Sequence, residues 1–133
     1  MIVDTSAIIA ILRREPEADL FIDLLAKAAR PKLSVANYVE ASAVVAAARD
    51  PFVARQLDEA IRAAGIEIMP VTVNQGFIAK DACRDFGKGS GHPARLNFGD
   101  CFAYALAKDL DEPLLFKGDD FSHTDVRAAV SPG

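Results

Sequence analysis

Residues 2–7 of the chain read IVDTSA, two apolar residues followed at once by a cluster that favours the start of a helix. The apolar pair predicts a short buried strand, and Asp4, Thr5 and Ser6 are residue types that cap helices. A strand that passes directly into a helix is the first half of a βαβ unit. Asp4 therefore falls at the carboxyl end of a strand, where parallel α/β sheets bind their ligands.

The same alternation of apolar runs and helical periodicity continues to the end of the chain. It predicts an α/β fold in which a mainly parallel central sheet is covered by helices on both faces, a three-layer α/β/α sandwich. A length of 133 residues suits a single domain over residues 1–133. We expect strands at residues 2–3, 32–33, 66–71 and 114–116, with a final short strand at 126–130. We expect helices at residues 7–12, 17–30, 34–49, 51–65, 72–86 and 97–109.

The composition is that of a protein with a packed core, because 51% of the residues are hydrophobic and 26% are charged. Cys83 and Cys101 are the only cysteines, too few for a disulfide framework or a zinc site. We expect both to be small apolar core residues in a protein of the reducing cytoplasm. The apolar stretches are too short to span a bilayer and the start is not that of a signal peptide, so we expect no membrane contact.

The net charge is −4, from 15 basic and 19 acidic side chains. Proteins that hold nucleic acid by electrostatics alone are usually basic. Either nucleic acid is not the partner, or bound cations and local basic patches reverse the sign of the charge where it matters.

Acidic residues recur at the exits of the predicted strands and at the starts of the helices. Each has an ordinary explanation when it is considered alone. Asp4 can cap a helix, Glu40 can reach solvent from an apolar helix, and Asp100 can complete a cap that begins at Asn97. Asp119 and Asp120 lie beside a glycine after the strand at 114–116, where turn residues are common.

Considered together, these acids could all point into one crevice at the carboxyl edge of the sheet. Carboxylates brought that close repel one another unless a cation lies among them. Oxygen ligands without histidine or cysteine favour a hard ion, Mg²⁺ or Mn²⁺, which also prefers phosphate oxygens. The set therefore indicates metal-assisted hydrolysis of a phosphodiester.

Four motifs in this order resemble those of the PIN-domain family, and in particular the VapC-like toxins of type II toxin–antitoxin systems. They are residues 3–7 (VDTSA), 37–40 (NYVE), 96–105 (LNFGDCFAYA) and 115–121 (LFKGDDF). The third motif is the most specific, and the resemblance covers essentially the whole chain. It implies a parallel sheet between helices and a Mg²⁺- or Mn²⁺-dependent endoribonuclease of the cytoplasm. It also implies a homodimer whose substrate is tRNA or rRNA and which a cognate antitoxin protein neutralises.

The resemblance also assigns roles to residues of the motifs. Asp4, Glu40 and Asp100 would be catalytic metal ligands and Asp119 the fourth acid, with Asp120 able to share or take that place. Thr5 or Ser6 would donate a hydrogen bond to a ligand carboxylate or a metal-bound water, as groups next to metal ligands often do, and Asn37 would support the ligands in the same way. The basic residues predicted to contact the RNA backbone are Lys80, Arg84, Lys88, Arg95 and Lys117, although each alone could be an ordinary surface charge.

Two alternatives remain at this point. A phosphatase of the haloacid-dehalogenase type also begins with an aspartate at a strand exit. Its chemistry needs a second aspartate two residues later, where this chain has Ser6. The other alternative is an inactive regulatory α/β module that binds Mg²⁺ and a partner.

Overall fold

The computed structural model describes residues 1–130, which form four parallel strands and six α-helices. The strands are β1 (Ile2–Val3), β2 (Lys32–Ser34), β3 (Glu67–Met69) and β4 (Leu114–Leu115), in the spatial order β3-β2-β1-β4. Ile2 lies opposite Lys32 on one side and Leu114 on the other. The carboxyl ends of β1, β2 and β4 therefore meet at one edge of the sheet.

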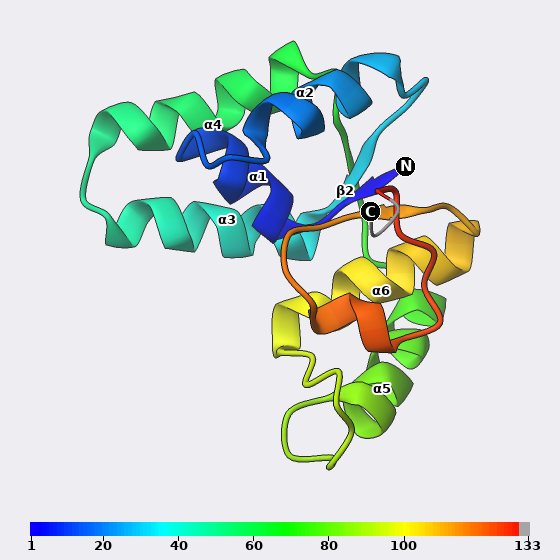
Figure 1. Ribbon diagram of the computed structural model, residues 1–133. Coiled ribbons are helices and arrows are strands. Elements are labelled where there is room, and N and C mark those ends of the chain that lie inside the picture. The colour runs from blue at the N-terminus through cyan, green and yellow to red at the C-terminus, as the bar shows by residue number, and fades with distance from the viewer. Residues whose placement is uncertain (131–133) are drawn as a thin grey trace.

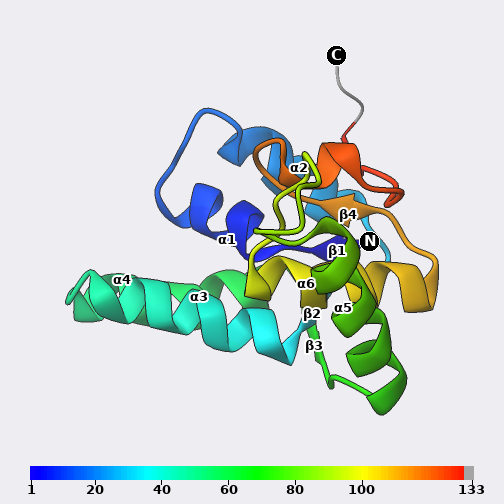
Figure 2. The same cartoon turned by 90° about the horizontal axis from the view of Figure 1, so that it is seen from below.

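Helices cover both faces of this sheet (Figure 1). One layer contains α1 (Thr5–Leu12), α2 (Ala18–Lys27), α3 (Val35–Ala47) and α4 (Pro51–Ala63). The other contains α5 (Val73–Phe86) and α6 (Phe98–Leu110), which lie in front of the strands in Figure 2. A short 3₁₀ helix, η1 (Asp120–His123), follows β4. The three-layer α/β/α prediction is confirmed.

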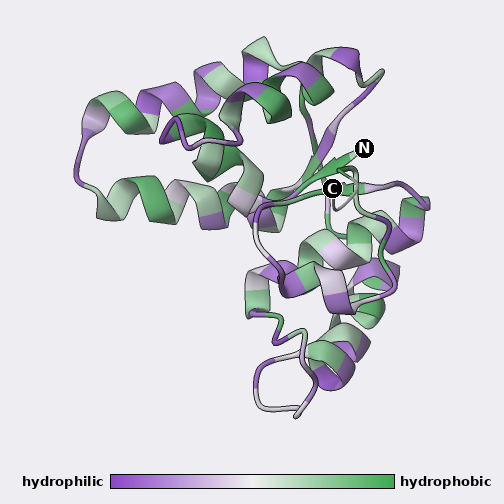
Figure 3. Ribbon diagram, viewed as in Figure 1, coloured by the Kyte–Doolittle hydropathy of each residue, from purple (hydrophilic) through white to green (hydrophobic). Residues whose placement is uncertain are grey.

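The side chains of the strands point alternately to the two faces of the sheet, so the core consists of two clusters, one on each face. Ile2 and Leu114 pack into the cluster formed with α5 and α6, whereas Val3 and Leu115 pack into the cluster formed with α1 to α4. Successive side chains of a strand point to opposite faces, so each two-residue strand contributes to both clusters. Figure 3 shows the apolar strands β1 and β4 in green, with helices on either side along which hydrophobic and hydrophilic residues alternate.

Several predicted element boundaries are wrong. The helix predicted at 17–30 ends at Lys27, because Ala28 turns to an extended conformation. The strand predicted at 66–71 is only Glu67–Met69, since it forms the sheet edge and Pro70 has no N–H to pair. The final strand predicted at 126–130 is a single bridge between Leu114 and Ala128, because β4 offers only two residues to pair. Within residues 1–130, no helix combines the length and apolar character needed to cross a membrane.

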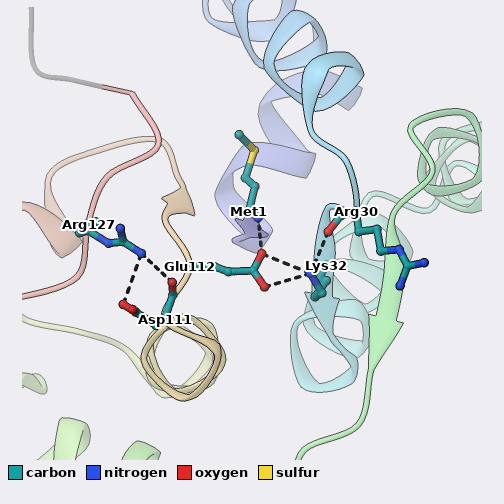
Figure 4. Close-up of polar contacts among 6 residues, drawn as sticks. All are labelled: Met1, Arg30, Lys32, Asp111, Glu112 and Arg127. Carbon is teal, nitrogen blue, oxygen red and sulfur yellow. Dashed lines mark hydrogen bonds and ion pairs between the residues drawn. The ribbon is translucent and has the colours of Figure 1, made fainter.

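A group of charges closes the amino-terminal edge of the sheet, opposite the edge that carries the acidic residues (Figure 4). The carboxylate of Glu112 accepts hydrogen bonds from the Met1 ammonium and from Lys32, the latter at 2.9 Å. Lys32 also donates to the carbonyl of Arg30 at 3.1 Å. Because these groups are largely shielded from solvent, they fasten β1 and β2 to the turn that precedes β4.

We expect Glu112→Gln to lower the melting temperature at pH 7 by about 2–5 °C. Burial raises the pKa of Glu112, but the bonds from the Met1 ammonium and Lys32 outweigh it and leave the pKa below its usual range. The folded state therefore binds this proton more weakly than the unfolded state. The contribution of Glu112 is present above the unfolded pKa and is lost as the pH falls through the folded pKa.

Thermal unfolding at pH 7 and at pH 3 checks this expectation, because the difference between wild type and variant should shrink at the lower pH. Glu59→Gln is the control, since its ion pair with Arg62 is exposed and should contribute little. A Glu112→Gln variant that melts with the wild type at pH 7 would contradict the assignment.

Candidate active site

Asp4 lies directly after β1 and is the N-cap of α1. Its backbone N–H donates to the carbonyl of Leu115 in β4, and its Oδ2 accepts a hydrogen bond from the backbone N–H of Ser6 at 3.0 Å. The other oxygen, Oδ1, is buried and has no hydrogen-bond partner among the described residues. Burial raises the pKa of Asp4 to about 6, and the charge of Glu40 contributes in the same direction. An unpaired carboxylate oxygen at 2% exposure favours the approach of a cation.

Asp100 occupies the first turn of α6 and forms a capping box with Asn97. Its Oδ2 accepts from the backbone N–H of Asn97 at 3.0 Å, and its own N–H donates to the Asn97 side chain at 2.8 Å. Burial, followed by the negative charge of Asp4, raises the pKa of Asp100 to about 7. Asp100 is thus a helix cap and a member of an acidic group at the same time.

Glu40 reaches the same place from the middle of α3, one turn after the buried Asn37. The side-chain amide of Asn37 donates to Glu40 Oε1 at 3.3 Å and to the carbonyl of Gly99 at 2.9 Å. A Cβ atom at Gly99 would lie 2.0 Å from Glu40 Oε2. The absence of a side chain at Gly99 therefore allows the Glu40 carboxylate to rest against the start of α6.

The two acids that follow β4 differ in their relation to this group. Asp119 precedes η1 and makes no side-chain capping bond, and Asp120 is the first residue of η1. Three carboxylates raise the pKa of Asp100 by their charge, namely Asp4, Asp120 and Glu40. Asp120 therefore acts on the acidic group through its charge, whereas no side-chain hydrogen bond or ion pair within residues 1–130 joins Asp119 to that group.

We call Asp4, Glu40, Asp100 and Asp120 the acidic cluster. Across residues 1–130, no three acidic, histidine or cysteine side chains are placed to ligate one ion directly. Mg²⁺ usually keeps several of its waters and uses only one or two carboxylates as direct ligands. The unpaired oxygen of Asp4 and the mutual repulsion of the cluster fit a partly hydrated divalent cation.

Comparison with known proteins agrees with this arrangement. The sequence matches the PIN domain over residues 1–127. The chain belongs to the PIN-domain family. The haloacid-dehalogenase alternative is therefore wrong.

The relatives of this PIN-domain chain are named as ribonucleases. It is 55% identical over 130 residues to ribonuclease VapC28 of Mycobacterium tuberculosis, covering 98% of each chain. It is 46% identical over 131 residues to ribonuclease VapC42 of the same species, covering 98% of this chain and all of that one. The match therefore extends over nearly the full length of this chain and of both VapC proteins.

Solved structures confirm the PIN fold at lower sequence identity. A toxin–antitoxin complex from Klebsiella pneumoniae superposes with a TM-score of 0.69 and 15% identity, covering 93% of this chain and 92% of that chain. M. tuberculosis VapC20, described as a toxin that cleaves the sarcin–ricin loop, gives a TM-score of 0.69 and 18% identity. It covers 95% of this chain and 98% of that chain.

Thr5 and Ser6, predicted to support the metal ligands, differ in what they contact. The backbone N–H of Ser6 binds Asp4, and its hydroxyl accepts from the backbone N–H of Lys117 at 2.9 Å. Ser6 thereby ties the exit of β4 to the start of α1. The Thr5 hydroxyl donates to the carbonyl of Asn37 at 3.3 Å, and the backbone of Thr5 forms a hydrogen bond with Asp4 that acts to lower the pKa of Asp4.

The basic residues predicted to contact RNA fall into two groups. Lys88 and Arg95 are exposed in the loop between α5 and α6. A β-bridge between Gly87 and Leu96 joins the two ends of this loop. Neither Lys88 nor Arg95 forms an ion pair with another residue of the range 1–130. The other three are paired with carboxylates: Lys80 with Asp81, Arg84 with Asp81 and Asp85, and Lys117 with Glu15 and Glu17.

Sequence reasoning missed Gly99 and Phe98. Phe98 is 77% exposed and packs edge-on against Phe102, with ring centroids 5.0 Å apart. Both rings line an open hollow of about 360 Å³ that also contains Glu40 and Gly99. The signal for Gly99 was its position directly before Asp100, but its role depends on how α3 packs against α6.

Proposed function

We propose that this chain is a Mg²⁺- or Mn²⁺-dependent endoribonuclease toxin that hydrolyses RNA phosphodiester bonds. The observation that carries the proposal is the acidic cluster, with an unpaired buried oxygen on Asp4, in a chain 55% identical to a named VapC ribonuclease. Asp4, Glu40 and Asp100 would hold the ion, with Asp120 or Asp119 as the fourth acid. When bound, such an ion supplies an activated water and offsets charge on the phosphate.

The residues around the cluster hold its carboxylates in position. Ser6 fixes one oxygen of Asp4, Asn97 fixes one oxygen of Asp100, and Asn37 fixes one oxygen of Glu40. Each of these acids therefore keeps its second oxygen for the ion or its waters. A small displacement of a reacting group lowers the reaction rate greatly. The hydrogen bonds that hold these carboxylates in position therefore contribute directly to catalysis.

The net charge of −4 is compatible with an RNA substrate if positive charge is concentrated near the site. Lys88 and Arg95 extend from a loop that leads directly into α6, so they are available to contact phosphates beside the cluster. Lys80, Arg84 and Lys117 would have to exchange their carboxylate partners for phosphates. We therefore assign the first phosphate contacts to Lys88 and Arg95.

The proposal includes the partners expected of such a toxin in the cytoplasm. The substrate would be tRNA or rRNA, in line with the description of VapC20, and a cognate antitoxin would neutralise the enzyme, in line with the Klebsiella pneumoniae complex. The enzyme would be a homodimer. Exposed apolar side chains at Val39, Phe77 and Phe98 are available for its interface.

Purified protein is expected to cleave tRNA or rRNA in the presence of Mg²⁺ or Mn²⁺, to stop in EDTA, and to resume when the metal is restored. The physical reason is that the clustered carboxylates repel one another, whereas a divalent cation among them offsets this repulsion and supplies the activated water. Gel analysis of RNA fragments measures the rate. Cleavage that continues in EDTA would refute the metal-dependent mechanism.

The double variant Asp4→Asn/Asp100→Asn, purified in parallel, is the control for contaminating nucleases. The same pair of proteins tests the toxin assignment in cells. Induced wild type should arrest growth, the double variant should not, and co-expression of the cognate antitoxin should restore growth. Normal growth with soluble, active wild type would refute the toxin role and leave the nuclease role intact.

A further inference from the structure

Cys83 on α5 and Cys101 on α6 lie side by side, with their Sγ atoms 2.7 Å apart. A disulfide bond is about 2.0 Å long, so the two sulfurs need to approach by only about 0.7 Å to be joined. Small buried residues, Ala79, Ala82 and Ala105, line the contact between the two helices and allow this approach. The expectation that both cysteines are core residues holds for Cys101 but is wrong for Cys83, which is exposed.

We propose that Cys83 and Cys101 form a thiol–disulfide site, which a low-molecular-weight disulfide such as oxidised glutathione converts reversibly into an intramolecular crosslink between α5 and α6. The exposed Cys83 reacts first: its thiolate attacks one sulfur of the small disulfide and releases one small thiol. Cys101 then attacks Cys83 Sγ, which releases the second small thiol. The protein loses two electrons and two protons, and the small disulfide gains them.

The burial of Cys101 and the short distance between the two sulfurs determine the order in which the cysteines react. Cys101 is fully buried, so an external disulfide reaches only Cys83. Once Cys83 carries the mixed disulfide, Cys101 is already in contact with its sulfur and needs no encounter from solution. Thiol pairs of this kind in cytosolic proteins are usually transient or redox-sensing instead of structural.

The crosslink would bear directly on the first turn of α6. Cys101 Sγ donates to the backbone carbonyl of Asn97 at 3.4 Å, and Asn97 forms the capping box with Asp100. Oxidation consumes the S–H group that makes this bond and ties the residue after Asp100 to α5. The oxidation state of Cys83 and Cys101 therefore affects the position of Asp100, an acid of the proposed active site.

The test is to incubate the folded protein with oxidised glutathione and to follow its mass and free thiols. We expect both thiols to disappear and the mass to fall by about 2 Da, with dithiothreitol restoring both. The melting temperature of the oxidised form should rise by several degrees, since the crosslink restricts the unfolded chain. Cys83→Ser should retain its single buried thiol and show no mass change, whereas Cys101→Ala should accumulate the glutathione adduct at Cys83.

Either of two results would overturn the proposal: a wild-type protein that stops at the glutathione adduct, or one that forms crosslinks only between two chains. The effect on catalysis rests on the proposed ribonuclease function. Oxidised wild type should cleave RNA several-fold more slowly, and dithiothreitol should restore the rate. Equal rates for the two forms would refute the coupling to Asp100, whereas absence of cleavage by the reduced protein would instead refute the ribonuclease function.

Discussion

Replacement of Asp100 by Asn is expected to lower the rate of metal-dependent RNA cleavage by about 10²–10³-fold, with no loss of folded stability at pH 7. Asparagine has the same shape, and its Oδ1 can still accept the hydrogen bond from Asn97, so the capping box survives. The substitution removes a negative charge that a bound ion needs. It also removes repulsion from Asp4, Glu40 and Asp120 in the metal-free protein.

The pH dependence of stability gives this prediction a second measurement. In the metal-free protein, burial and neighbouring charges raise the pKa of Asp100 to about 7 and that of Asp4 to about 6. Between pH 4 and pH 7 the folded state therefore holds protons that the unfolded state has released. Stability falls as the pH rises through this window. Asp100→Asn should flatten that fall, because one of the two groups no longer titrates.

Activity assays in Mg²⁺, together with thermal unfolding in EDTA at pH 5 and pH 8, check both parts. Asp19→Asn is the matched control, because Asp19 is an exposed aspartate in the first turn of another helix. It should leave activity and the pH profile unchanged. A variant at position 100 that keeps full turnover would remove Asp100 from the mechanism, and a stability profile equal to that of wild type would refute its raised pKa.

Gly99→Ala is expected to slow RNA cleavage by about 10–100-fold while the protein stays folded. The new methyl group would overlap the Glu40 carboxylate, which lies 2.0 Å from the position of the added carbon. That carboxylate is the end of a flexible side chain, so it yields and leaves the acidic cluster while the helices remain in place. Alanine also favours helix over glycine, which limits any cost in stability.

A matched control for this variant is Gly76→Ala in α5, where an added carbon meets nothing within 4 Å. It should leave the cleavage rate unchanged. If Gly99 acts through Glu40, then Gly99→Ala should cause little further loss in a Glu40→Gln background, because the two changes remove the same interaction. Fully additive losses would show that Gly99 acts by another route.

The sequence was informative where function depends on neighbouring residues. Asp4 could be placed because a strand exit and a helix cap follow each other within the stretch 2–6. Asp100 could be placed because its spacing from Asn97 is that of a capping box. Both features depend on hydrogen bonds between residues that lie only two or three positions apart in the sequence, so a local sequence pattern predicts them.

The features that escaped prediction depend on packing between distant segments. Gly99 and Glu40 meet only because α3 and α6 pack together, and the two cysteines meet only because α5 and α6 do. Lys117 finds Glu15 and Glu17 across more than 95 residues of chain, and no local pattern encodes that pairing. The choice between Asp119 and Asp120 depends on the path of a single turn after β4.

The dual role of the two buried aspartates bears on how such a protein can change over time. An Asp codon becomes an Asn codon by one base change, and asparagine caps a helix as well as aspartate does. At positions 4 and 100, a single mutation can therefore silence the chemistry and leave the scaffold intact. Relatives that keep the fold but carry asparagine at either place would be stable proteins able to bind the same partners without cutting RNA.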